Sequence, residues 1–175
     1  MTPADAGMPC AAAPSLRRRL AAFVYEGVLL FGVLMLAGLA YGVVTQQRHA
    51  LVGLHGLQFF VFVVLGVYFG WFWSHGGQTL AMKTWHLRLL TTDGLQVSVA
   101  RALLRYLLSW LWFLPALAWS YLTGVRSAAT VAAALIIGVL AYAASSRLHP
   151  QRQYWHDLLS GTRLVQWQAS PRRQG

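Results

Sequence analysis

The sequence has few charged residues, and very few of them are acidic. Of its 175 residues only 10% are charged, whereas a soluble domain carries about 25%. There are four carboxylates, Asp5, Glu26, Asp93 and Asp157, against 14 lysines and arginines. So few charges cannot cover a water-exposed surface, and 57% of the residues are hydrophobic. Soluble globular, disordered and coiled-coil classes are excluded, and a one-domain integral membrane protein is predicted.

Other absences narrow the range of functions. Cys10 is the single cysteine, which excludes an intrachain disulfide and any cysteine cluster for zinc or an iron–sulfur centre. The six histidines do not have metal-ligand spacing, and no nucleophile motif occurs. His156 and Asp157 are adjacent, and neighbouring side chains on a helix point apart, so no catalytic pair is expected there. We therefore expect no enzymatic activity and no bound cofactor or metal.

Long apolar stretches are the main feature that is present. Four of them occur, at residues 20–44, 57–73, 106–122 and 128–144. Each has about 17–25 residues, the length that a helix needs to cross about 30 Å of hydrocarbon. None shows strand-like alternation, so a β-barrel is not expected. The predicted fold class is an all-α membrane protein with four transmembrane helices.

Basic residues cluster in the connections between these stretches. Twelve lie before the first stretch, between the second and third, or after the fourth: Arg17, Arg18, Arg19, Lys83, Arg88, Arg101, Arg105, Arg147, Arg152, Arg163, Arg172 and Arg173. Only Arg48 and Arg126 lie in the other two connections. The positive-inside rule then places both termini and the middle loop in the cytoplasm. Nucleic-acid binding is not expected, because the basic residues do not share one polar face.

The N-terminal region also has features of a secretory signal peptide. Arginines precede an apolar run, and residues 37–40 faintly resemble a cleavage site. The run is about twice the usual length and carries Glu26. A retained membrane helix is therefore the favoured interpretation.

The connection between the second and third stretches is the most structured soluble piece. Residues 86–91 and 95–98 resemble short strands, and the turn signal Thr92-Asp93-Gly94 lies between them. This pattern predicts a β-hairpin-like loop.

After that loop, Ser98 is placed to cap a helix that leads into the third span. Arg101 and Arg105 are four residues apart on this helix, so they share one face, which we expect to contact lipid headgroups. Pro115 lies within the third stretch and is expected to kink it.

Tryptophans and paired glycines are placed as in other membrane helices. The eight tryptophans mostly fall near the ends of the predicted spans, which indicates an interfacial belt. Gly38 and Gly42, and likewise Gly66 and Gly70, form small-residue packing patterns. The two patterns lie at opposite membrane faces in this topology. Each therefore needs another helix or another subunit as its partner.

Glu26 is the residue that most strongly suggests a function. It follows Arg19 by seven residues, which is nearly two helical turns, or about 10 Å along the same face. An unpaired carboxylate at that depth costs at least a few kcal/mol. It is either a proton- or cation-binding group or one partner of a structural salt bridge, and the sequence leaves both open.

Several scattered motifs together resemble the RDD family of small prokaryotic membrane proteins, named for one Arg and two Asp. The matching residues are Arg19, Glu26, Gly77, Gln78, Thr79, Leu80, Lys83, Asp93, Gly94, Arg101, Arg105, His156, Asp157, Gly161 and Thr162. The resemblance extends from Arg18 to about Val165. It implies an RDD-type membrane domain over residues 17–166 in a cell inner membrane, with a flexible tail over 1–16 and a basic tail over 167–175.

The resemblance also assigns the named residues. The family's Arg corresponds to Arg19 and its second Asp to Asp157, while its first Asp is replaced by Glu26. The family's Gly-Lys-Lys reads Ala81-Met82-Lys83 here. Some members look like sodium–proton antiporters, so the resemblance implies transport of small cations or protons by analogy.

Two functional hypotheses remain at this point. In a transporter, Glu26 exchanges a proton for a cation, Asp157 assists, and Arg19 tunes both. In a scaffold or accessory subunit, the same three residues form a salt-bridge cluster that fixes the C-terminal segment to the first helix. The lipid bilayer is the expected partner in either case. Four helices are few for alternating access, so a transporter would need a homo-oligomer.

Overall fold

The computed structural model describes residues 13–46, 54–124, 127–146 and 153–167. The two predicted tails lie almost entirely outside these ranges, as do Arg48, Arg126, Arg147, Arg152, Arg172 and Arg173. The described chain is mostly helical. In chain order its elements are α1 (Leu16–Thr45), α2 (Leu54–His75), α3 (Leu80–Thr84), β1 (Leu87–Thr91), α4 (Val99–Ser109), the 3-10 turn η2 (Trp110–Trp112), α5 (Leu114–Thr123), α6 (Ala128–Ser145), α7 (Trp155–Leu159) and β2 (Thr162–Gln166).

Three helices, α1, α2 and α6, are each long and apolar enough to cross a membrane. Helices α4 and α5 make a fourth candidate span, bent by 45°. Large apolar side chains cover the outside of these helices; Leu36 is 69% exposed and Val44 is 82% exposed. Lipid, not water, is the solvent that suits such a surface. The prediction of membrane-spanning apolar helices is confirmed, with three or four spans.

The third span, predicted at residues 106–122, is a bent pair of helices. Helix α4 begins at Val99, and the Oγ of Ser98 accepts a hydrogen bond from the Arg101 N–H (3.4 Å), as predicted. The helix then gives way to η2 and resumes as α5, with Pro115 in the first turn. Proline has no N–H to donate, so it is tolerated at a helix start and not inside a helix. The break therefore lies where this proline costs least.

The predicted β-hairpin is wrong in its pairing. Strand β1 pairs antiparallel with β2, near the C-terminus, and not with residues 95–98. Leu87 lies opposite Gln166, and Thr91 lies opposite Thr162. The turn itself is present, because the Thr91 N–H bonds to the Leu95 oxygen at 2.9 Å. The chain leaves this turn toward α4 and does not form a second strand.

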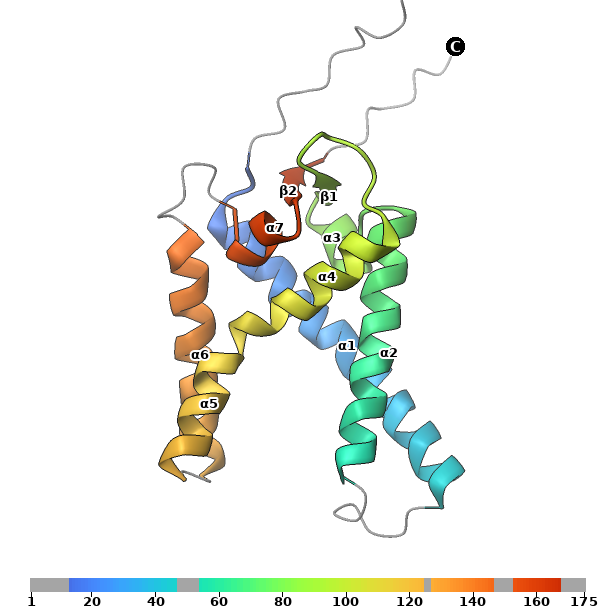
Figure 1. Ribbon diagram of the computed structural model, residues 1–175, viewed down its shortest axis with the longest axis vertical. Coiled ribbons are helices and arrows are strands. Elements are labelled where there is room, and N and C mark those ends of the chain that lie inside the picture. The colour runs from blue at the N-terminus through green and yellow to red at the C-terminus, as the bar shows by residue number, and fades with distance from the viewer. Residues whose placement is uncertain (1–12, 47–53, 125–126, 147–152, 168–175) are drawn as a thin grey trace, which may run out of the picture.

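The sheet and two short helices form a cap layer, made of α3, β1, α7 and β2. Figure 1 shows this layer at one end of the molecule, where α1 begins and α2 ends. Leu87, Leu89, Val97 and Val165 are almost completely buried there. The core beneath continues into the spans through Ala102 and other residues of α4. The cap layer is thus built onto the ends of the spans and is not a separate domain.

Two glycines allow α2 and α4 to approach closely. A Cβ on Gly66 would lie 3.2 Å from the Tyr106 ring, and one on Gly70 would lie 3.2 Å from Leu103. This packing pattern therefore has its partner within the chain. Around Gly38 and Gly42 on α1, by contrast, a Cβ would meet no described atom within 4 Å.

Candidate functional site

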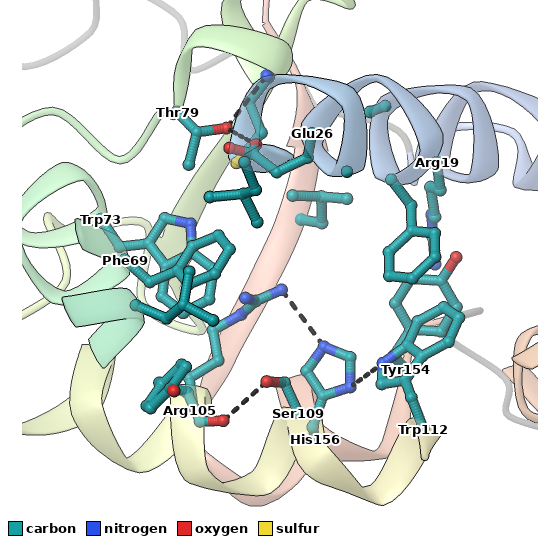
Figure 2. A pocket seen from close by; sticks show the side chains of 18 of the residues that line it. Arg19, Glu26, Phe69, Trp73, Thr79, Arg105, Ser109, Trp112, Tyr154 and His156 are labelled. Carbon is teal, nitrogen blue, oxygen red and sulfur yellow. Dashed lines mark hydrogen bonds between the residues drawn. The ribbon is translucent and has the colours of Figure 1, made fainter. Parts of the chain in front are cut away.

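A cavity of about 390 Å³ lies beneath the cap layer, between α1, α2, α4 and the α7–β2 segment. Figure 2 shows its side chains converging from these elements. Most of the lining is apolar or aromatic. The charged or hydrogen-bonding side chains among the lining residues include Arg19, Glu26, Thr79, Arg105, Ser109, Tyr154 and His156. An apolar cavity with a few converging polar groups is the usual form of a ligand site.

Glu26 lies at one wall of this cavity, held by two hydroxyl groups. Tyr68 Oη donates to one carboxylate oxygen at 2.8 Å, and Thr79 Oγ1 donates to the other. Thr79 also accepts the Met82 N–H and so caps α3. No basic side chain of the described ranges forms an ion pair with Glu26. Among the residues that the structure describes, this carboxylate is therefore bonded to hydroxyls and not to a fixed counter-charge.

Asp157 has a different environment, buried behind the opposite wall, where Arg105 and His156 line the cavity. Its Oδ1 accepts a hydrogen bond from Arg105 Nε at 2.8 Å, and its side chain is 0% exposed. The Arg105 guanidinium also lies over the Trp73 ring, 4.2 Å from the ring centre. The sequence suggested that Arg105 contacts lipid headgroups. This expectation is wrong, because Arg105 is buried and neutralises Asp157. Arg101, one turn earlier, is exposed.

The hydrogen bonds around His156 determine its tautomer. Trp112 Nε1–H can only donate, and it lies 3.2 Å from His156 Nδ1, so Nδ1 is the acceptor. The ring proton of the neutral form is then on Nε2, which lies 3.4 Å from Asp157 Oδ1. Arg105 Nη2 is 3.3 Å from the same Nε2, and in this tautomer both atoms are donors. We infer that the protonated Nε2 of His156 lies beside Asp157 Oδ1 and that Arg105 Nη2 has no acceptor on this ring.

Burial also sets the charge state of this histidine. It lowers the pKa of His156 to about 4, with the Arg105 and Arg19 charges acting in the same direction and Asp157 opposing them. His156 is therefore neutral near pH 7. The expectation that adjacent His156 and Asp157 side chains point apart is wrong, because α7 is a single short helical turn and both side chains turn toward Arg105.

Arg19 lines the same cavity from α1. Its guanidinium carbon lies 5.1 Å from the centre of the Tyr154 ring. Arg19 is only 4% exposed, and its Nε and Nη2 have no hydrogen-bond partner among the described residues. Tyr154 is also buried, which raises the pKa of its phenol to about 12 and keeps it neutral.

Of the three residues predicted to form one cluster, Arg19 and Glu26 line the cavity and Asp157 is buried behind Arg105, and the three do not form a salt-bridge network. Glu26 bonds to hydroxyls, Asp157 pairs with Arg105, and Arg19 stacks on Tyr154. No ion pair joins any two of the three within the described residues.

The remaining motif residues mainly build the cap layer. Gly77 has φ +68°, and a Cβ there would meet the Leu89 carbonyl oxygen at 2.5 Å, so this position requires glycine. Gln78 Nε2 donates to the Leu87 carbonyl. Gly94 and Gly161 also have positive φ, at the two chain reversals. Thr162 Oγ1 donates to the Asp157 carbonyl at 3.3 Å.

Lys83 and Asp93 lie at the surface and line neither wall of the cavity. Within the described ranges, no three His, Cys, Asp or Glu side chains gather as a metal site would require.

Sequence reasoning missed several contributors to this site. Tyr68 is the single hydroxyl in the apolar stretch 57–73, and an isolated hydroxyl in such a run requires a partner. Trp73 and Trp112, expected in the interfacial belt, are buried and line the cavity. Trp71 and Trp119 are exposed, as a belt requires.

Comparison with known proteins identifies the family. The sequence model of the RDD family matches residues 13–161, which include all the membrane helices and the Glu26, Arg105 and Asp157 positions. No curated protein and no solved structure matches the chain. The family match covers most of the sequence and agrees with the motif resemblance, and on this basis the chain belongs to the RDD family.

Proposed function

We propose that this RDD protein transports small cations or protons and that Glu26 is the residue that binds them. The observation that carries the proposal is the setting of Glu26. It is a carboxylate in an apolar cavity between membrane helices, held by two hydroxyls and without a basic partner among the described residues. A carboxylate within a span is a functional candidate by default, because its burial is costly.

The hydroxyl shell suits an exchange between a proton and a cation. When Glu26 is protonated, its O–H needs an acceptor, and a hydroxyl oxygen can provide one by rotating. When Glu26 is ionised, Tyr68 and Thr79 donate to it. After the Glu26 carboxyl has released its proton, a small cation could take its place: the two hydroxyls keep their protons and turn them away, and the carboxylate and hydroxyl oxygens become ligands, which are the types that hard cations prefer. A fixed Arg or Lys partner would oppose both the protonated state and the cation-bound state, because its positive charge favours the ionised carboxylate and repels a cation.

The proposal includes four spans, with both termini in the cytoplasm of an inner membrane. Support comes from the positive-inside pattern and from the cap layer, where α1 begins, α2 ends and the middle connection folds (Figure 1). Arg88, Arg101 and Arg163 belong to this end of the molecule. In a cysteine-free background, single cysteines at Tyr121 and Asp93 should react with an external membrane-impermeant reagent only at position 121.

A non-enzymatic scaffold is the second candidate, and the Asp157 site favours it. A completely buried carboxylate paired with Arg105 and His156 has the features of a structural element that fixes the C-terminal segment to α4. Under this alternative the cavity would have no transport role. Assembly of several copies is part of the transport proposal, because one set of four spans offers little material for alternating access.

The test is cation-driven proton flux in proteoliposomes. Wild-type protein is reconstituted with an internal pH-sensitive dye, and sodium, lithium or potassium is added outside. We expect flux from the wild type and its loss in Glu26→Gln, because the amide cannot exchange a proton. Glu26→Asp keeps the acid and should retain part of the flux.

The matched control is Asp93→Asn, which removes an exposed carboxylate that does not line the cavity and should leave the flux unchanged. Circular dichroism and size-exclusion profiles establish that each variant is folded. Flux in Glu26→Gln equal to that of the wild type would contradict the proposal, as would no flux from a folded, reconstituted wild type.

A further inference from the structure

The charge of Arg19 has no counter-charge in the described structure. This side chain is 96% buried, as its 4% exposure shows, and two of its three nitrogens have no hydrogen-bond partner among the described residues. The Tyr154 ring beneath it supplies a cation–π contact. Buried charges in proteins are normally paired and hydrogen-bonded, because their desolvation is costly. A guanidinium in this setting is suited to pairing with an anion.

Neither nearby carboxylate supplies that anion. Asp157 is committed to Arg105 through a 2.8 Å bond, and Glu26 accepts from Tyr68 and Thr79. Neither forms an ion pair with Arg19. The Oη of Tyr154 is a second buried donor without a partner among the described residues. Arg19 and Tyr154, which both line one end of the cavity, therefore carry buried N–H and O–H groups without an acceptor among the described residues.

The rest of the cavity is suited to a hydrocarbon chain. Away from Arg19, its lining includes Phe23, Leu30, Leu65 and Phe113 from α1, α2 and the start of the second half of the bent span. Phe23 is partly exposed on the outside of α1, so this part of the lining reaches the face that contacts lipid. Figure 2 shows Arg19 and Tyr154 together on one side, with Phe69 and Trp73 across the space.

From this arrangement we propose that the cavity binds an anionic amphiphile, with its phosphate or carboxylate headgroup on Arg19 and Tyr154 and its apolar chain between α1 and α2. A planar guanidinium matches such an oxyanion through two parallel hydrogen bonds. The Arg19 nitrogens without partners are packed against protein, so binding requires the side chain to turn away from the Tyr154 ring. The site shares its cavity with Glu26, but its headgroup contacts are to Arg19 and Tyr154, so it does not depend on the assignment of Glu26 to cation binding.

The apolar lining distinguishes this ligand from a free anion. Inorganic phosphate would gain the guanidinium but leave the apolar walls unfilled, and would have to give up its hydration. An amphiphile retains the same headgroup contacts and adds burial of its chain, at about 0.8 kcal/mol per CH₂. Headgroup and chain are therefore both required.

The experiment measures ligand-induced stabilisation of the whole protein in an uncharged detergent. Oleyl phosphate, oleyl alcohol and inorganic phosphate are added separately, and the Tm is followed. Oleyl phosphate should raise the Tm in a concentration-dependent manner. Oleyl alcohol has the same chain without the charge, and inorganic phosphate has the charge without the chain, so each should have a much smaller effect.

Three variants locate the site. Arg19→Gln removes the charge and should weaken oleyl phosphate about tenfold or more, because a charge-assisted bidentate contact is lost. It should fold, because it replaces an uncompensated buried charge with a neutral amide. Tyr154→Phe removes the hydroxyl donor and keeps the Arg19 charge, so it should weaken oleyl phosphate binding less than Arg19→Gln does. Arg17→Gln removes an exposed charge two residues away and is the matched control.

Three results would overturn the proposal. One is an unchanged oleyl phosphate response in a folded Arg19→Gln. Another is equal stabilisation by oleyl alcohol, which would make the site a hydrocarbon pocket only. The third is equal stabilisation by inorganic phosphate, which would make it a simple anion site. Absence of any oleyl phosphate effect on the wild type would count against it in the same way.

Discussion

Glu26 lines the cavity, whereas Asp157 is buried behind the opposite wall, which Arg105 and His156 line, and the two carboxylates have opposite kinds of partners. Asp157 is fully buried and accepts from a guanidinium, with a neutral histidine beside it. Glu26 is partly buried and accepts from two hydroxyls. A guanidinium holds its charge at any ordinary pH, whereas a hydroxyl can rotate and switch between donor and acceptor. The Arg105–Asp157 pair behind one wall thus has fixed charges. Glu26 at the other wall can gain or lose its proton while its hydroxyl partners stay hydrogen-bonded to it.

This difference teaches that a family's charged positions need not act together. The motif joins Arg19, Glu26 and Asp157 by name, and a single salt-bridge cluster was the simple expectation. In the structure each of the three has its own partner, and Arg105 takes the counter-ion role. The two carboxylates can therefore have separate roles, Glu26 in the cavity and Asp157 in the buried pair with Arg105.

The largest effect should come from Asp157→Asn. It leaves the buried Arg105 charge without its partner, which is expected to lower the free energy of unfolding by about 3–5 kcal/mol. Denaturant unfolding of the purified protein in detergent measures this loss. Glu26→Gln should cost only about 1 kcal/mol under the same conditions, because its amide oxygen still accepts a hydroxyl. Equal losses of unfolding free energy in the two variants would contradict the proposed difference between Asp157 and Glu26.

A smaller effect is expected from pH. The pKa of His156 is about 4 in the folded protein and about 6.5 when unfolded, so the unfolded chain binds more protons between these values. Stability should therefore fall as the pH is lowered from about 6.5 to 4, by about 3 kcal/mol, and should not respond to this group above pH 6.5.

His156→Gln isolates that contribution. The amide can still accept from Trp112 and donate toward Asp157, but it does not titrate. Unfolding free energies of both proteins across this pH range give the difference, in which the shared carboxylates largely cancel. Parallel curves of unfolding free energy against pH for the two proteins would show that His156 is not held neutral in the folded protein.

The smallest effect should come from Tyr68→Phe. This change removes one of the two hydroxyls on Glu26 and should cost about 1 kcal/mol in unfolding free energy. Tyr121→Phe is the matched control, since Tyr121 is 88% exposed, and it should have almost no effect. If Tyr68→Phe lost as much unfolding free energy as Asp157→Asn, the Glu26 site would be as important for stability as the Arg105–Asp157 pair.

Much of the fold could be predicted because hydropathy along the chain is a local signal. The apolar stretches at 20–44, 57–73 and 128–144 became α1, α2 and α6 with ends shifted by a few residues. The Ser98 cap was also local and is confirmed. The sheet was mispredicted because its turn is local but its second strand is not: α4, η2, α5, α6 and α7 all lie between β1 and β2.

The site was harder to predict for a related reason. The spacing of Arg101 and Arg105 fixes that they lie near one face of a helix, but not what covers each of them. Arg105 directly precedes an apolar stretch, which could have marked it as needing a carboxylate. The aromatic side chains that surround Arg19 and His156 carry no distinguishing pattern in a sequence with eight tryptophans and seven tyrosines.

Strand β1 cannot form its sheet with β2 until the C-terminal segment has been synthesised. Arg105 and Asp157 are 52 positions apart, and the last span lies between them. During synthesis, the earlier helices enter the membrane while the Arg105 charge and the β1 edge are still unmatched. The C-terminal segment supplies both partners at once. A chain that ends after α6 therefore retains an uncompensated arginine and an open strand edge, the features by which quality control distinguishes unfinished proteins from finished ones.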